Sequence, residues 1–166
     1  MIKSEERYKR LRRAERQVTD LTTIRSIIDN CKVMRLAMQD EKGLYIVPVN
    51  FGYHMTEDGT LRLYLHSAGE GRKVKVLSGE QEIAVEMDCS HQLVKADQPC
   101  NFSYFYQSLT GTGVPEKLEN PEEKKRALNK IMLHQEGKEF EFSDAMVSGV
   151  AVFEITVKEY SVKQHV

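Results

Sequence analysis

The most regular pattern of hydrophobic and polar positions lies in residues 61–77. Leucine occupies every second position of 61–65, with polar or aromatic side chains between, and this alternation is typical of a strand with one buried face. The small residues of 67–71 then predict a turn, because they hinder a sharp change of direction very little. Apolar positions in 72–77 predict a short helix that packs back on the core.

Five further strands and two longer helices follow from the same reasoning. Tight turns that contain Gly and Asp separate the strands expected at 31–38, 44–55 and 61–66, so we expect these three to form an antiparallel meander. The stretch 89–101 has no periodic pattern and is expected to be an irregular loop. The remaining strands are expected at 81–88, 102–118 and 149–160, and the helices at 20–30 and 120–135.

Proline and glycine mark irregular points in two of these strands. Pro48 cannot donate a backbone hydrogen bond, so its strand is expected at a sheet edge, where free backbone groups either face a ligand or simply mark the edge. Gly111 and Gly113 predict a bend in 102–118. Together the elements favour a mainly β fold class, an antiparallel β-barrel with flanking helices. The lack of a repeating βαβ pattern argues against a Rossmann domain.

Composition and charge exclude few classes of function. The 166 residues fit one domain, and 24 basic against 25 acidic residues leave no global field that would indicate a nucleic acid or membrane partner. Residues 1–18 form a locally basic arm, and 19–166 are expected to be the single folded domain. The arm either binds nucleic acid or is a tail that contacts solvent or a partner, and the tail is favoured.

The lack of a recognisable targeting signal and the odd number of cysteines indicate a cytoplasmic protein. No apolar run reaches the roughly 20 residues that cross a bilayer, and the charged N-terminus lacks the apolar stretch of a signal peptide. The odd number of cysteines favours reduced thiols. Cys89, His91 and Cys100 do not have the spacing of a zinc site, so no metal is expected.

The start of the short helix is a candidate anion site. Arg72 and Lys73 directly follow a strand and a glycine turn, beside backbone N–H groups that have no partner in a first helical turn. A bound phosphate would offset two positive charges at the positive end of a helix dipole. Alternatively both cations are solvated, since the segment has neither the P-loop nor the dinucleotide-binding fingerprint.

Five segments, in order along the chain, carry a family resemblance. They are Arg13-Ala-Glu-Arg16-Gln-Val-Thr19-Asp20, Val33-Met-Arg35-Leu36-Ala37, Tyr45-Ile-Val-Pro48-Val49-Asn50-Phe51-Gly52-Tyr53, Tyr64-Leu-His66-Ser67-Ala68 and Gly71-Arg72-Lys73. Together they resemble the nitroimidazole-resistance (Nim-type) flavoproteins, which are FMN-binding split barrels related to pyridoxamine 5′-phosphate oxidase. The similarity extends over nearly the whole chain.

The resemblance implies a split β-barrel that forms a homodimer with FMN at the subunit interface. It assigns the FMN phosphate to Arg72 and Lys73, with Ser67 and the backbone near His66 close by. It also associates His66 with the ligand site. The residues that it places along the flavin ring and ribityl chain are Arg35, Leu36, Ala37 and Met38 in one strand, Val49, Asn50 and Phe51 at the sheet edge, and Gln107 and Ser108 in the aromatic-rich strand.

The implied activity is that of an FMN-dependent oxidoreductase that passes electrons to a small acceptor, for example a nitroaromatic compound. Because the cofactor carries the redox chemistry, His66 is the candidate catalytic side chain, as a hydrogen-bond or proton donor, or else it only orders the phosphate turn. Pyridoxamine-type oxidases end in Arg-Leu-x-Pro, whereas residues 160–166 read Tyr-Ser-Val-Lys-Gln-His-Val. Oxidation of pyridoxamine phosphate is therefore not expected.

Two other classes of function stay open. One is a non-catalytic flavin- or haem-binding protein, in which His66 or His91 would be the axial ligand of a haem. The other is a nucleic-acid-binding module that uses the basic arm and whose binding would fall steeply with salt.

Overall fold

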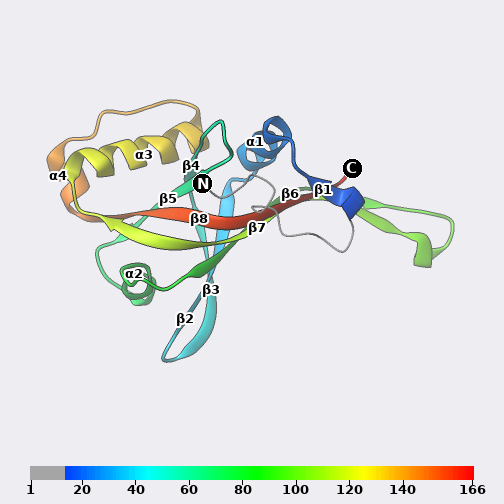
Figure 1. Ribbon diagram of the computed structural model, residues 1–166, viewed down its shortest axis with the longest axis horizontal. Coiled ribbons are helices and arrows are strands. Elements are labelled where there is room, and N and C mark those ends of the chain that lie inside the picture. The colour runs from blue at the N-terminus through cyan, green and yellow to red at the C-terminus, as the bar shows by residue number, and fades with distance from the viewer. Residues whose placement is uncertain (1–13) are drawn as a thin grey trace.

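A computed structural model (Figure 1) describes residues 14–166. Its strands are β1 (Gln17–Val18), β2 (Val33–Asp40), β3 (Gly43–Asn50), β4 (Gly52–Met55), β5 (Leu61–Ala68), β6 (Ile83–Val94), β7 (Ser103–Leu118) and β8 (Val150–His165). Its helices are α1 (Leu21–Asn30), α2 (Arg72–Leu77), α3 (Pro121–Glu136) and α4 (Asp144–Ser148), with short 3-10 turns at Ala14–Arg16 and Pro99–Asn101.

The strands form one open antiparallel sheet that curls into a split barrel. The 8-stranded sheet has the order β3-β2-β6-β7-β8-β5-β4, and β1 pairs with β8 off this path. Within residues 14–166, β3 and β4 are the two edges and do not pair with each other, so the barrel stays open. The predicted fold class is therefore confirmed.

Most of the core lies between the sheet and helices α1 and α2. In Figure 1 these helices lie on opposite sides of β7 and β8. The buried side chains that they contribute are Ile24, Ile27 and Ile28 from α1 and Val74, Val76 and Leu77 from α2. Helix α3 covers the other face of β5 and β8, where a second, smaller cluster consists of Tyr64, Ala127, Ile131 and Val152.

Capping residues set the ends of the two longer helices where the sequence predicts them. Asp20 accepts a hydrogen bond from the backbone N–H of Thr23 at 2.8 Å and so caps α1. Asn120 caps α3, which has proline at its first position, and Gly137 ends α3 in the left-handed conformation.

Both predicted strand irregularities are confirmed. Pro48 lies in β3, whose only strand partner in the described sheet is β2. The pairing of β7 with β8 shifts by one residue between Thr112 and Gly113, at the predicted bend. Within residues 14–166, no strand pairs with the outer edge of β3.

The predicted three-stranded meander is wrong. The segment 44–55 is not one strand, because the chain leaves β3 at Phe51, whose side chain is fully buried, and enters β4. As a result β2–β3 and β4–β5 are separate hairpins at opposite edges of the sheet. Burial of one aromatic side chain ends the strand, and alternation of residues alone cannot show this.

The stretch 89–101 is more regular than predicted. Strand β6 continues to Val94 after a bulge between Cys89 and Gln92, where Ser90 has a φ of 59°. With the first half of β7 it forms an arm that projects from the barrel (Figure 1). The bulge breaks the alternation of side chains, which explains why the sequence pattern ended early. Strand β8 also extends beyond its predicted end, and α4 was not predicted.

Two further findings concern the chain as a whole. Among the described helices, none is long and apolar enough to cross a membrane. Of the predicted basic arm, Val18 is buried and pairs with Val162, so its last residues join the sheet. Most of the arm lies outside the described residues.

Candidate functional site

The candidate phosphate site is built from the end of β5, a glycine loop and the start of α2. Gly71 has a φ of 132°, in the region that favours glycine, and turns the chain from the loop into the helix. Helix α2 has only 6 residues, so side chains rather than a helix dipole must supply most of the attraction for an anion. At its first turn Arg72 is exposed and Lys73 is half-buried.

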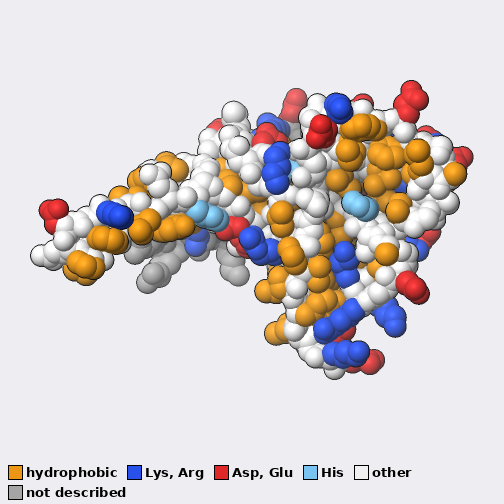
Figure 2. Space-filling view, turned by 180° about the vertical axis from the view of Figure 1, so that it is seen from behind, with side chains coloured by type: hydrophobic (Ala, Val, Ile, Leu, Met, Phe, Trp, Pro, Cys, Tyr) orange, Lys and Arg blue, Asp and Glu red, His pale blue; other side chains and the backbone are white. Residues whose placement is uncertain are grey.

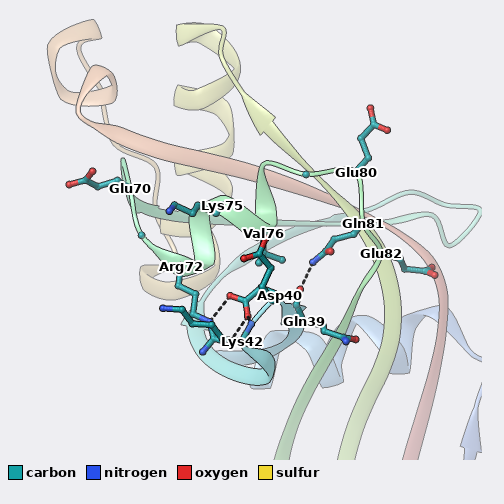
Figure 3. Close-up of a pocket in the computed structure, with 13 residues that line it drawn as sticks. Gln39, Asp40, Lys42, Glu70, Arg72, Lys75, Val76, Glu80, Gln81 and Glu82 are labelled. Carbon is teal, nitrogen blue, oxygen red and sulfur yellow. Dashed lines mark hydrogen bonds and ion pairs between the residues drawn. The ribbon is translucent and has the colours of Figure 1, made fainter.

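Arg72 is held by the β2–β3 hairpin (Figure 3). Its Nε and Nη2 donate to the two oxygens of the Asp40 carboxylate, each at 2.7 Å, and Nη2 also donates to the Gly43 carbonyl at 3.2 Å. The Tyr45 ring covers one face of the guanidinium, with its centroid 3.8 Å from Cζ. The Tyr45 hydroxyl donates to the backbone oxygen of Arg72 at 3.4 Å. We call Asp40, Gly43 and Tyr45 the arginine clamp.

The two predicted cations have different electrostatic surroundings. The hydrogen bonds from Arg72 lower the pKa of Asp40 to about 2, and the same contact raises the pKa of Arg72. Burial lowers the pKa of Lys73. Within residues 14–166 no carboxylate forms an ion pair with Lys73. A partly buried ammonium without a counter-charge is costly, so Lys73 favours a bound anion.

A cavity of about 1320 Å³ lies beside the clamp (Figure 3). Carboxylates outnumber cations in its lining, so the centre of the cavity is a poor place for a phosphate. Arg72 lines it and Lys73 does not, so an anion held by both would lie at the rim of the cavity. The lining residues are Gln39, Asp40, Glu41, Lys42, Glu70, Gly71, Arg72, Lys75, Val76, Gly79, Glu80, Gln81 and Glu82.

A second polar group lies on the exposed face of β2 and β6. Nη1 of Arg35 donates to Glu86 at 2.9 Å and to Asp88 at 2.5 Å, and these hydrogen bonds raise the pKa of Arg35. Asp88 also accepts from His91, whose Nε2 lies 2.8 Å away. Across the ladder Asp88 pairs with Ser108 of β7. The structure therefore brings together two of the predicted cofactor residues, Arg35 and Ser108.

Three of the predicted cofactor residues have side chains in the core. Leu36 and Phe51 are 0% exposed and Met38 is 2% exposed, so these residues can meet a ligand only through their backbone. Ala37 and Val49 are half-buried, and Asn50 is exposed at the end of the β3 edge.

The other predicted residues lie on β5 and β7. His66 is exposed, and Ser67, half-buried, lies next to it at the end of β5. Gln107 accepts a hydrogen bond from the Ser90 hydroxyl at 2.8 Å, and its amide donates to Gln164 at 3.3 Å. The bulge in β6 thus supports Gln107 at the base of the projecting β6–β7 arm.

Asp40 and Tyr45 are site residues that the sequence analysis did not identify. Asp40 fits a hairpin turn and Tyr45 fits an alternating strand, so both have ordinary structural explanations. Neither gives a sequence signal of a contact with Arg72, because that contact crosses between elements that are about 30 residues apart in the chain. The contact of Arg35 with Asp88 likewise gives no sequence signal, because it joins residues that are distant in the chain.

His134 and Cys31, which lie outside this region, have structural surroundings. His134, which the sequence analysis treats as structural, is buried, and its Nε2 lies 2.8 Å from the Cys31 carbonyl. Burial lowers the pKa of His134 and raises that of Cys31. No group of three or more metal-ligating side chains gathers in the part of the chain that the structure describes.

Comparisons with known proteins agree with this architecture. Residues 20–164 match the pyridoxamine 5′-phosphate oxidase family. A candidate 5-nitroimidazole antibiotic resistance protein from Bacteroides thetaiotaomicron VPI-5482 is 33% identical, with a TM-score of 0.76 over 89% of this chain and 86% of that chain. A search of curated proteins finds no match.

Two more distant structures share the fold. The flavocytochrome Anf3 from Azotobacter vinelandii is 20% identical, with a TM-score of 0.75 over 94% of this chain and 72% of its own. The FAD and haem binding protein from Mycobacterium smegmatis is 16% identical, with a TM-score of 0.76 over 90% and 73%. The family match and the 33% identical structure are decisive. The chain belongs to the pyridoxamine 5′-phosphate oxidase family, as its resemblance to the Nim-type flavoproteins implied.

Proposed function

We propose that this protein binds FMN and passes electrons through it to a small nitroaromatic acceptor. The observation that carries the proposal is the juxtaposition of Arg72 and Lys73 at the first turn of α2, next to the open edge of the split barrel. The 33% identity to the candidate nitroimidazole-resistance protein supports the choice of acceptor.

The residues at this edge fit an FMN phosphate. Lys73 would supply a charge-assisted hydrogen bond. Two hydrogens of Arg72 remain on Nη1, for which the structure gives no partner between residues 14 and 166. The hydroxyl of Ser67, half-buried at the end of β5, would add a neutral donor.

The flavin ring needs a different surface, with backbone donors and acceptors along a plane. Among the described strands β3 pairs only with β2, so its outward backbone groups near Val49 and Asn50 would be available to a ring. Arg35, Ala37 and Ser108 would line the same region from β2 and β7, and Gln107 would contact it from the base of the arm. Leu36, Met38 and Phe51 would contribute backbone atoms alone, because their side chains are buried.

Bound FMN would supply the redox chemistry, since it accepts electrons from a donor and returns them to an acceptor. The protein would bind and orient the flavin and hold a proton donor nearby. His66 is our candidate for that donor, because its exposed imidazole lies beside Ser67 and histidine is the side chain that most often transfers protons in catalysis.

Replacement of His66 with glutamine is expected to slow turnover by about tenfold and to leave FMN affinity nearly unchanged, because glutamine keeps a hydrogen-bond donor but cannot supply a proton. Flavin reduction and reoxidation are measured at saturating FMN. His54→Gln, on the exposed surface of β4, is the matched control and should behave as wild type. An unchanged rate in His66→Gln would indicate that His66 has only a structural role.

The electron acceptor is tested with paired compounds. Reduced, FMN-loaded protein is expected to be reoxidised anaerobically by a 5-nitroimidazole and not by the same imidazole without its nitro group. Reoxidation at equal rates by both, or by neither, would contradict a nitroaromatic acceptor while leaving FMN binding intact.

We also propose a homodimer, with the interface on the exposed face of the β2–β3 hairpin. Leu44 is 80% and Ile46 66% exposed on this face, and their partners in the ladder are Gln39 and Ala37. Figure 2 shows hydrophobic side chains over the β2–β3 hairpin, with charged side chains near its tip. An open edge strand with an apolar face is normally covered, and a second copy would do this and close a wall of the flavin site.

Replacement of Ile46 with aspartate is expected to weaken this dimer by at least about tenfold, because each copy would bury an unpaired charge at the interface. Light scattering at micromolar concentration measures the effect. Met146→Asp is the matched control, since Met146 is 63% exposed on α4, away from the hairpin. A wild-type monomer, or equal effects of the two substitutions, would contradict this interface.

A further inference from the structure

We propose that Asp40 and Tyr45 are positioning residues that hold Arg72 in the orientation in which it binds an FMN phosphate. This inference rests on the proposed FMN site and extends it to two residues that would not themselves touch the cofactor. Figure 3 shows Asp40 and Arg72 directly opposite each other, whereas Glu70 and Glu80 point away from the pair.

The clamp contacts the guanidinium of Arg72 along one edge and on one face. The two bonds to Asp40, each at 2.7 Å, fix its plane and its rotation within that plane. The Gly43 carbonyl takes a further hydrogen of Nη2 at 3.2 Å. The Tyr45 ring, 3.8 Å below Cζ, prevents movement toward one face. Nη1 alone is left to face a ligand.

The clamp also contacts the backbone of Arg72. The Tyr45 hydroxyl donates to the Arg72 carbonyl at 3.4 Å, so a single side chain contacts both ends of the arginine. Asp40 is itself fixed by the backbone N–H of Lys42, which donates to it at 2.9 Å. The hairpin therefore presents a rigid acceptor, and Arg72 loses its rotational freedom before any ligand binds.

A positioning role and a purely electrostatic role of Asp40 predict opposite effects of its removal on FMN affinity. A carboxylate near a phosphate site repels the phosphate, so its removal should strengthen FMN binding or leave it unchanged. If Asp40 positions Arg72, its removal should weaken FMN binding. The sign of the change therefore separates the two explanations.

The test compares FMN and riboflavin affinities of the full-length wild type, Asp40→Asn, Tyr45→Leu and Glu41→Gln. Asparagine keeps the shape of Asp40 but accepts only one of the two guanidinium bonds, and leucine removes the stacked ring without a change of charge. We expect both variants to weaken FMN binding roughly three- to tenfold and to leave riboflavin binding unchanged. Glu41→Gln removes a carboxylate of the same cavity for which the structure records no contact with Arg72, and it should bind FMN at least as tightly as wild type.

Four outcomes separate the possibilities. A fall in FMN affinity in both clamp variants, with riboflavin unchanged, supports the inference. Equal or tighter FMN binding by Asp40→Asn overturns it. Parallel losses of FMN and riboflavin affinity also overturn it, because they indicate general damage to the site. A wild type that binds FMN no better than riboflavin would overturn the proposed phosphate site, and the clamp with it.

Discussion

Replacement of Lys73 with alanine is expected to weaken FMN binding by roughly ten- to a hundredfold, because a charge-assisted hydrogen bond to a phosphate contributes about 1.5 to 3 kcal/mol. Lys73 is half-buried and has no carboxylate partner among the described residues, so its loss would not be compensated locally. Riboflavin has no phosphate and should bind wild type and variant almost equally. Calorimetric or fluorescence titrations of both ligands measure the difference.

Lys75 provides the matched control for this substitution. It lies on the same helix and is exposed in the acidic cavity, so Lys75→Ala removes an equal charge two residues further along α2. We expect it to change FMN affinity by less than about twofold. Similar losses in the two variants would show that general charge, and not Lys73 itself, attracts the cofactor.

Replacement of Gly52 with alanine is expected to lower the free energy of unfolding by roughly 3 kcal/mol. A Cβ at this position would lie 2.3 Å from the backbone carbon and oxygen of Lys130 and 2.4 Å from the nitrogen of Ile131. These are backbone atoms of helix α3, which cannot rotate away as a side chain can. Either α3 or β4 must therefore move, and this movement would disrupt the packing of the smaller hydrophobic cluster beneath α3.

Gly69→Ala is the control, because a Cβ at Gly69 meets no atom within 4 Å and its φ is not in the left-handed region. Its stability should stay within about 0.5 kcal/mol of wild type. Urea unfolding monitored by circular dichroism gives both values. A small effect of Gly52→Ala would mean that α3 does not pack against β4 in the way described here.

Much of the fold is predictable because local chemistry sets it. Asp20 and Asn120 are strong helix caps, and Pro48 restricts its strand to an edge, so these features follow from single residues. The break at Phe51 and the continuation of β6 past Cys89 depend on tertiary packing and on a bulge. A pattern of alternating residues contains neither kind of information.

The candidate site is predictable to a similar extent. Arg72 and Lys73 follow a glycine turn, which is a local signal, and the structure places both at the first turn of α2. The contacts of Asp40 and Tyr45 with Arg72, and of Asp88 with Arg35, join strands and a helix that are distant in sequence. These contacts depend on the strand order of the folded sheet, which places the β2–β3 hairpin next to α2.

The most direct test of flavin binding is the cofactor that the purified protein retains. The protein is incubated with FMN and, separately, with haem, unbound ligand is removed, and the absorption spectrum and the mass of the released cofactor are recorded. We expect flavin absorption bands and release of about one FMN per chain, with no retained Soret band. A protein that retains haem and not FMN, or neither, would contradict this expectation.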